Sequence, residues 1–258
     1  MELLALPAFA DNYIWMIHNG LEALVVDPGD AAPVNDALKR YGLKLTAILV
    51  THHHADHVGG LSALQGGGVT IYGPREESIP WVTESVEQGD IVHWNQMVFE
   101  VVDVRGHTRG HVAYLARNGL ASSGSPPVAF VGDTLFSGGC GRVFEGTMSE
   151  MHDSLSTIAS WPDQTLLCSA HEYTLNNLRF ALAVEPDNPF LLEHLAYCES
   201  LRAQGTPTLP TTLRKELTIN PFLRCAEPSV QSAALSHGAS DIDSLSVFTA
   251  LRTWKNVF

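Results

Sequence analysis

The stretch Thr51-His52-His53-His54-Ala55-Asp56-His57 places four imidazoles and one carboxylate within seven residues. It follows an apolar run, Leu45 to Val50, of the kind expected for a strand buried on both faces. Imidazole nitrogens and carboxylate oxygens are good ligands for zinc and iron. In an irregular loop, His52 and His54 would turn to one side while Asp56 and His57 turn to another. The stretch therefore predicts a metal site that suits two ions better than one.

Three further predicted strands end in residues that commonly bind metals. They are His107 or His111 after a hairpin over 91–104, Asp133 after a strand over 128–131, and His171 after a strand over 165–170. Loops at strand ends, held by a rigid sheet, usually form the site in α/β architectures. Spacing alone does not choose between His107 and His111. The set supplies too many ligands for one tetrahedral ion, and the two oxygens of Asp133 can bridge two ions.

The rest of the chain divides near residue 174 into a mixed part and a helical part. An Asn19-Gly20 pair between two apolar runs predicts a hairpin. Asn188 followed by Pro189 predicts the N-cap and first residue of a helix. We expect an α/β (α+β) domain over residues 1–173 and an all-helical domain over residues 174–258. Other expectations are helices at 33–41, 58–64, 149–161, 176–184, 188–204, 228–236 and 243–257, an extended segment at 206–224, and a loop rich in Ser, Gly and Pro at 122–127.

Composition excludes several classes of protein. The net charge of −13 over 258 residues argues against a nucleic-acid partner, which would call for a basic face. No apolar run approaches the roughly 18–20 residues that a membrane span needs, and the N-terminus lacks the basic start of a secretory signal. The four cysteines are far apart and form no CxxC pair, which argues against a thiolate zinc site and a disulfide framework. A reduced, cytoplasmic setting is the default expectation.

The ligand motifs resemble a known family. The run Thr51-His52-x-His54-x-Asp56-His57 resembles the metallo-β-lactamase superfamily, together with Gly106-His107-Thr108, Gly132-Asp133-Thr134 and Ala170-His171-Glu172-Tyr173. Within that superfamily the chain is similar to glyoxalase II, hydroxyacylglutathione hydrolase. The segments that carry this narrower resemblance are Gly132 to Arg142, Phe144-Glu145-Gly146-Thr147, Ala170 to Thr174, Asn220 to Arg224, and Leu251-Arg252-x-x-Lys255.

The resemblance implies a fold and a ligand assignment. It implies a metallo-β-lactamase-like four-layer αβ/βα sandwich as catalytic domain, followed by a helical substrate-binding domain. It implies two divalent metal ions, with zinc favoured and iron or manganese as alternatives. His111 is then structural, and His53 is not a ligand. The implied ligands are His52, His54 and His107 for one ion, Asp56, His57 and His171 for the other, and Asp133 as the bridge.

The resemblance also implies an activity. It implies hydrolysis of S-D-lactoylglutathione, and of other S-2-hydroxyacylglutathiones, to D-lactate or another 2-hydroxy acid and glutathione, the second step of methylglyoxal detoxification. A water that bridges two cations is acidified, and no GxSxG signature is present, so a metal-bridging hydroxide is the expected nucleophile. The resemblance places Arg142, Tyr173, Arg252 and Lys255 beside the glutathione carboxylates. A monomer is the default expectation.

Three other residues stand out in this comparison. Phe144 departs from the pattern, because some family members have a tyrosine there, and a phenylalanine cannot donate a hydrogen bond. Asp27 and Cys140 are expected close to the metals without binding them, and Asp27 could orient a ligand imidazole.

Alternative functions predict different sequences. An iron-dependent persulfide dioxygenase acting on a glutathione derivative needs one iron, held by two His and one Asp. Such an enzyme does not need a second set of ligands, so the presence of Asp56, His57 and His171 together argues against it. A metal- or thiol-binding protein without catalysis would be expected to lose ligands. A lactamase or lactonase should lack the Arg252 to Lys255 tail.

Overall fold

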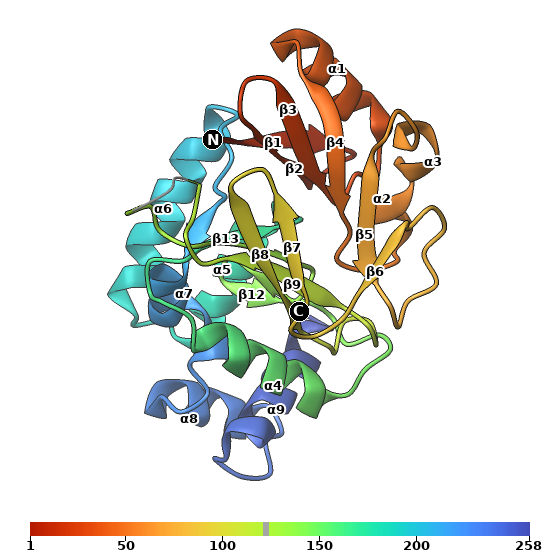
Figure 1. The fold of residues 1–258 in the computed structure, drawn as a ribbon. Coiled ribbons are helices and arrows are strands. Elements are labelled where there is room, and N and C mark those ends of the chain that lie inside the picture. Colours follow the sequence, from red (N-terminus) through yellow and green to blue (C-terminus); the bar gives the residue numbers. More distant parts are fainter. Residues whose placement is uncertain (121–123) are drawn as a thin grey trace.

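Two six-stranded mixed sheets form the centre of the fold (Figure 1). The computed structural model describes residues 1–120 and 124–258, so part of the loop expected at 122–127 lies outside the described residues. The first sheet has the order β1 (Glu2–Ala8), β2 (Asn12–His18), β3 (Glu22–Val26), β4 (Lys44–Leu49), β5 (Thr70–Pro74) and β6 (Glu84–Val86). The second has the order β14 (Thr211–Thr212), β13 (Leu166–Ser169), β10 (Val128–Gly132), β9 (Val112–Ala116), β8 (Met97–Asp103) and β7 (Ile91–Trp94). A short hairpin adds β11 (Leu135–Phe136) and β12 (Gly139–Cys140).

Apolar side chains on both faces of each sheet create four layers. One cluster lies between the sheets and joins Trp15 and Leu49 of the first to Phe99 and Phe130 of the second. A second cluster packs the other face of the first sheet against the helices α1 (Ala31–Tyr41) and α3 (Leu61–Leu64). A third packs the other face of the second sheet against α4 (Met148–Ala159). The four-layer metallo-β-lactamase-like sandwich expected from the sequence is confirmed.

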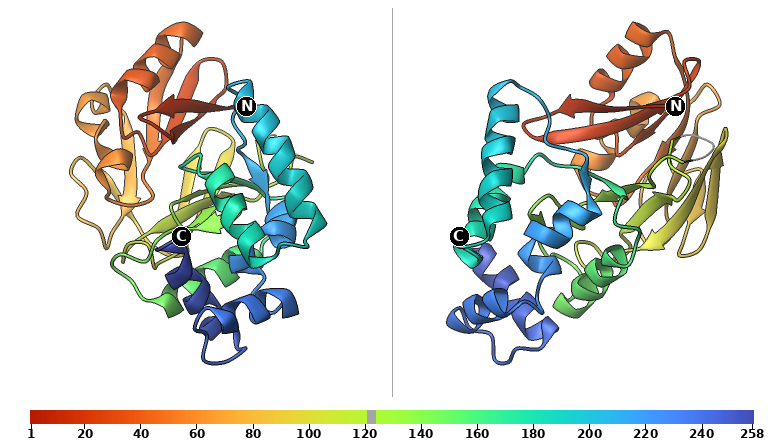
Figure 2. Two further views of the ribbon diagram at one scale, coloured as in Figure 1. Left: turned by 180° about the vertical axis from the view of Figure 1, so that it is seen from behind. Right: turned by 90° about the vertical axis from the view of Figure 1, so that its left-hand side faces the viewer.

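The chain after residue 173 is mainly helical. Its elements are α5 (Thr174–Val184), α6 (Pro189–Ala203), α7 (Leu213–Ile219), the 3-10 turn η1 (Pro221–Leu223), α8 (Pro228–Ser236) and α9 (Ser244–Lys255). Figure 2 shows these helices grouped along one side of the two sheets. Phe180, Phe222 and Phe248 belong to the same buried cluster as Val131 of β10. The C-terminal helices therefore share one core with the second sheet and α4. No helix among the described residues is long and apolar enough to cross a membrane.

Local sequence signals explain some element boundaries and miss others. The predicted hairpin is present: the Asn19 side chain accepts hydrogen bonds from the Leu21 and Glu22 backbones, and Gly20 takes φ 89°. Asn188 caps α6 as expected. The prediction of an extended segment at 206–224 is wrong, because this segment contains the helix α7. The helix begins after Thr212, whose hydroxyl caps it by accepting a hydrogen bond from the Lys215 N–H. Edge strand β1 was not predicted, and its half-buried residues show little alternation.

Close packing of glycines shapes the segment that follows β4. The helix expected at 58–64 is two short helices, α2 (Ala55–Val58) and α3, separated by Gly59-Gly60. A Cβ atom on Gly60 would lie 2.5 Å from the Pro28 carbonyl oxygen, and one on Gly29 would lie 1.8 Å from the Asp56 carbonyl oxygen. Only glycine permits such backbone contact. The β3–α1 turn therefore fixes where α2 begins, and α2 carries two of the expected ligands.

Candidate metal centre

The ligand loop begins where β4 ends and is anchored by a buried carboxylate. Asp27, at the end of β3, accepts hydrogen bonds from the Thr51 N–H and hydroxyl, both at 2.8 Å. Its Oδ2 also lies 3.1 Å from His57 Nδ1. Asp27 has φ 52°, an uncommon conformation for a residue other than glycine. One carboxylate thus connects both ends of the loop and orients the His57 ring, the position that the sequence suggested for it.

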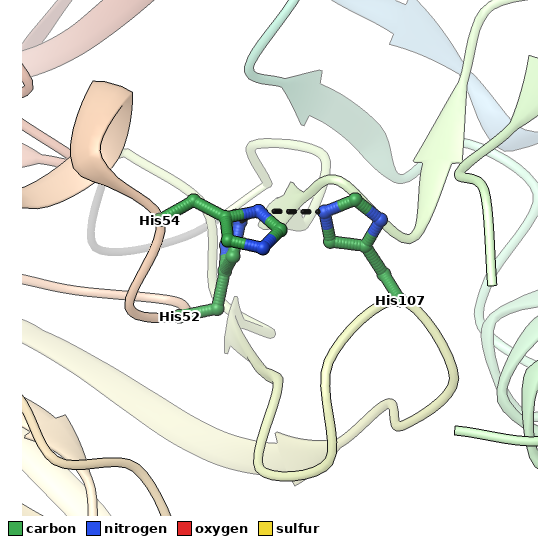
Figure 3. A group of neighbouring side chains, drawn as sticks. All are labelled: His52, His54 and His107. Atoms are coloured by element: carbon green, nitrogen blue, oxygen red, sulfur yellow. Dashed lines mark hydrogen bonds between the residues drawn. The ribbon is translucent and has the colours of Figure 1, made fainter. Parts of the chain in front are cut away.

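Three histidines from both sheets form a first group. His54 Nδ1 lies 3.1 Å from His52 Nε2 and 3.1 Å from His107 Nε2. Figure 3 shows the three rings turned toward one another, with His52 and His54 from the loop after β4 and His107 from the loop after β8. Nitrogens bound to one tetrahedral zinc at about 2.0–2.1 Å lie roughly 3.3 Å from each other. The first group thus has the spacing of a metal site.

A second group contains Asp56, His57 and His171. Asp56 Oδ2 lies 3.6 Å from His57 Nε2 and 3.4 Å from His171 Nε2. Asp56 and His57 belong to α2, and His171 follows β13. Each group therefore combines residues from both halves of the sandwich.

Asp133 lies between the groups and presents one oxygen to each. Its Oδ1 lies 3.5 Å from His57 Nε2 and 3.4 Å from His171 Nε2. Its Oδ2 lies 3.4 Å from His107 Nε2 in the first group. This is the arrangement that a carboxylate bridging two cations requires.

Buried polar atoms in this centre lack partners. Within the part of the chain that the structure describes, His57 Nε2 and Asp133 Oδ1 are fully buried and make no hydrogen bond. A buried polar group without a partner costs free energy, which a cation would offset. The donor set contains imidazoles and carboxylates and no thiolate, so it fits zinc, iron or manganese. The residues present therefore fit divalent metal ions.

The two groups differ in charge. Burial lowers the pKa of His52 and of His107, so both rings are held neutral. Burial also lowers the pKa of His57, but Asp133 and Asp27 outweigh it and raise that pKa well above its usual value. Burial favours the neutral form of His171, but the carboxylates of Asp133 and Asp56, each 3.4 Å from its Nε2, outweigh burial and raise the pKa of His171 to about 10. The carboxylates around His57 and His171 therefore make the surroundings of the second group more negative than those of the first, which favours a cation.

His111 and His53 occupy supporting positions. His111 stacks on His52 with ring centroids 4.6 Å apart, and its Nε2 accepts a hydrogen bond from the Asp133 N–H at 3.1 Å. His53 lies between two glutamates, 2.9 Å from Glu77 Oε2 and 3.2 Å from Glu145 Oε1, with its ring centroid 5.0 Å from that of His54. Glu77 also accepts from Thr108, so it connects the loops that carry His53 and His107. No motif in the sequence predicted this role of Glu77.

A cavity of about 430 Å³ opens beside the metal centre. Its walls include ligands of the centre and basic residues from the end of α9. The lining residues are His107, Asp133, Phe136, Cys140, Arg142, Phe144, Tyr173, Asn177, Arg252 and Lys255. The four residues expected to bind substrate are thus together, at the cavity that reaches the ligands.

Comparison with known proteins identifies the family. A family model described as the Hydroxyacylglutathione hydrolase C-terminus matches residues 172–258, and one described as the Metallo-beta-lactamase superfamily matches residues 9–171. A hydroxyacylglutathione hydrolase from Albidiferax ferrireducens is 49% identical over 100% of both chains. The chain belongs to the hydroxyacylglutathione hydrolase family. A second member, from Aliivibrio salmonicida, is 49% identical over 98% of both chains.

Solved structures support the fold of this hydroxyacylglutathione hydrolase family member. ETHE1 from Myxococcus xanthus matches with a TM-score of 0.65 at 22% identity, covering 100% of this chain and 99% of that one. TTHA1623, solved in a di-iron-bound form, matches with a TM-score of 0.58 at 22% identity, covering 86% and 100%.

The cavity of this hydroxyacylglutathione hydrolase family member combines buried and exposed groups. Arg252 is only 2% exposed, whereas Phe144 is 61% exposed. The Phe144 ring meets His107 edge to face at 5.3 Å. Tyr173 stacks on His171 at 4.6 Å, and Lys255 Nζ lies 3.4 Å from the Asn176 carbonyl oxygen. The cavity therefore contains the cationic side chains of Arg142, Arg252 and Lys255, together with aromatic rings that pack on the candidate ligands His107 and His171.

Proposed function

We propose that this chain hydrolyses S-D-lactoylglutathione and related S-2-hydroxyacylglutathiones to a 2-hydroxy acid and glutathione. The observation that carries the proposal is the cavity that joins Arg142, Arg252 and Lys255 to His107 and Asp133. Glutathione has two carboxylates, which need cationic partners, and its thioester would lie toward the ligands. The names of the full-length relatives support the same reaction. This activity is the second step of methylglyoxal detoxification.

We propose two divalent cations, zinc first and iron or manganese as alternatives. His52, His54 and His107 would hold one, Asp56, His57 and His171 the other, and Asp133 would bridge them. Bound cations lower the pKa of a water, so that hydroxide is available near neutral pH, and polarise a carbonyl. In the overall reaction the water oxygen joins the thioester carbon, the C–S bond breaks, and the thiolate leaves as glutathione.

The chain's own side chains bind and orient the substrate. Arg142 is exposed at the cavity, and its guanidinium can meet a carboxylate with two hydrogen bonds. Lys255 supplies a compact charge. Burial raises the pKa of the Tyr173 hydroxyl, so that hydroxyl stays protonated and can donate to a substrate oxygen. The aromatic faces of Phe136 and Phe144 exclude water from the path to the ligands.

We further propose residues 1–173 as the catalytic domain and residues 174–258 as the substrate-binding domain, in a cytoplasmic monomer. All four cysteines are buried and reduced, which fits a reducing compartment. The C-terminal domain contributes Asn177, Arg252 and Lys255 to the lining of the cavity.

The test is hydrolysis of S-D-lactoylglutathione, followed at the thioester absorbance, together with metal content per chain. We expect turnover with two metal ions bound. Two bound ions without turnover would overturn the substrate assignment. One bound iron together with oxygen consumption would instead favour a mononuclear persulfide dioxygenase. The presence of two complete ligand groups argues against that alternative.

A further inference from the structure

The turn between β1 and β2 places two polar side chains against ligands of the second group. His171 Nδ1 donates to Asp11 Oδ1 at 2.8 Å. The neighbouring Asn12 donates from Nδ2 to Asp56 Oδ2 at 3.0 Å. Asp11 and Asn12 lie about forty positions before the histidine loop, outside every motif used to predict the site. Two consecutive residues thus contact two of the three ligands in one group.

Backbone hydrogen bonds connect this turn to the segment that carries His171. The Tyr13 N–H donates to the Ala170 carbonyl at 2.7 Å, and the Glu172 N–H donates to the Asp11 carbonyl at 2.8 Å. These bonds flank His171 on both sides. Phe9, at the start of the turn, has φ 51°, a conformation that L side chains adopt only at a cost. The fold maintains this turn against strain, and the result is a fixed distance between Asp11 and His171.

The hydrogen-bond partners of the two groups differ in charge. In the first group, His107 Nδ1 donates to the Arg142 carbonyl at 2.8 Å, and His52 Nδ1 lies 3.1 Å from the Thr51 hydroxyl. Both partners are neutral. In the second group, His171 meets the Asp11 carboxylate, and His57 lies beside Asp27. A carboxylate behind an imidazole fixes its tautomer and makes its other nitrogen a stronger ligand.

We propose that Asp11 is a positioning residue that raises the affinity of the second group for its cation and leaves the first group unaffected. The inference rests on the two-cation centre proposed above. Asn12 assists by fixing the Asp56 carboxylate, whose side chain is otherwise 40% exposed. The turn at residues 9–12 therefore controls how many cations the chain retains when metal is scarce.

The experiment measures zinc binding without substrate, by competition with a chromophoric chelator. Asp11→Ala should retain one zinc with the parent affinity and bind the other about 10- to 100-fold more weakly, the usual effect of losing such a partner. Asp11→Asn should lose less, because its amide oxygen still accepts from His171. Asp30→Asn is the matched control, since Asp30 caps α1 and Asn caps equally well. It should bind both zinc ions as the parent does.

Two further variants, His54→Ala and His171→Ala, serve as backgrounds that identify which zinc ion binds more weakly. In His54→Ala, whose first group is broken, adding Asp11→Asn should weaken the remaining zinc. In His171→Ala, adding Asp11→Asn should change nothing. Unchanged zinc affinities in both Asp11 variants, or weakening in the His171→Ala background, would overturn the inference. Should Asp11→Ala fail to fold by circular dichroism, the isosteric Asp11→Asn decides. A parent chain that binds fewer than two zinc ions would instead contradict the two-cation centre itself.

Discussion

Arg252 Nη1 donates to the carbonyl oxygen of Cys140 over 2.8 Å, from a side chain that is only 2% exposed. Its Nη2 donates to Asn256 Oδ1 at 3.2 Å, while Nε is buried without a partner among the described residues. Arg252 therefore lies inside the protein, although it belongs to the last turn of the C-terminal helix α9. Arg252 therefore supports the backbone at Cys140, the last residue of β12, and is also one of the residues that line the cavity.

The first prediction concerns Arg252. Arg252→Ala should raise KM for S-D-lactoylglutathione roughly tenfold or more and lower kcat much less, because a hydrogen bond to a charged group contributes about 1.5–3 kcal/mol. Arg252→Lys should rescue only part of the loss, since an ammonium cannot reach both Cys140 and Asn256 as a guanidinium does. Steady-state kinetics measures both, with exposed Thr253→Ala as control. A lower kcat at unchanged KM would contradict the substrate-binding role.

The second prediction concerns pH. Burial first, and then the nearby Arg252 charge, lower the pKa of Lys255 to about 8. In the free enzyme the ammonium is therefore lost as pH rises through about 8, and with it one partner for a substrate carboxylate. We expect kcat/KM to fall above that pH while kcat, measured with substrate bound, falls less. Lys255→Arg keeps its charge and should move the fall to higher pH. Identical profiles for the two proteins would exclude Lys255 as the cause.

The third prediction concerns cation removal. Cations that bind only the folded chain stabilise it, by about 2.7 kcal/mol at a concentration of 100 times Kd. Chelation should therefore lower the midpoint of thermal unfolding, and added zinc should restore it. Asp133→Asn, which keeps the shape but removes the bridging charge, should show a smaller difference between the two conditions. Calorimetry with and without chelator measures this. An unfolding midpoint independent of zinc would count against a metal centre.

The fourth prediction concerns Glu216, a fully buried carboxylate that joins α7 to the hairpin β11–β12. It accepts hydrogen bonds from the Ser137 hydroxyl, the Gly138 N–H, the Thr211 hydroxyl and the Asn220 amide. In Glu216→Gln, the amide NH₂ group would face these donors and could accept no hydrogen bond from them. The free energy of unfolding should therefore fall by about 1–3 kcal/mol. Urea unfolding measures the change, with exposed Glu199→Gln on α6 as control. Equal stability of the two variants would show that the donors find other partners.

Local signals in the sequence predicted a mixed α/β part, a helical part and the ligand candidates, whereas the four-layer arrangement was predicted from the family resemblance. Alternating and continuous apolar runs mark the strands, and the loop after β4 concentrates four histidines in one place. Strand ends then place distant residues in one cleft. Spacing alone did not show whether His107 or His111 is the ligand, and the motif resemblance chose His107. The structure adds a physical difference, because His111 Nε2 accepts a hydrogen bond from the Asp133 N–H.

The missed residues act only through contacts made by the folded chain. Asp11 and Glu77 belong to no motif used to predict the site, and each contacts a histidine from another segment of the chain. Helix α7 was mistaken for an extended segment because seven residues show too little periodicity to identify. Its placement depends on Glu216, whose partners come from three separate segments.

The two candidate metal-binding groups each take side chains from both halves of the sandwich, with Asp133 between them. Sliding one sheet over the other would separate His107 from His52 and His171 from Asp56. Cation occupancy and docking of the sheets are then linked equilibria, and each must favour the other by the same free energy. With cations bound, the amide hydrogens of both sheets should exchange with solvent as a single cooperative unit. Without cations, each sheet should be able to unfold locally and exchange on its own.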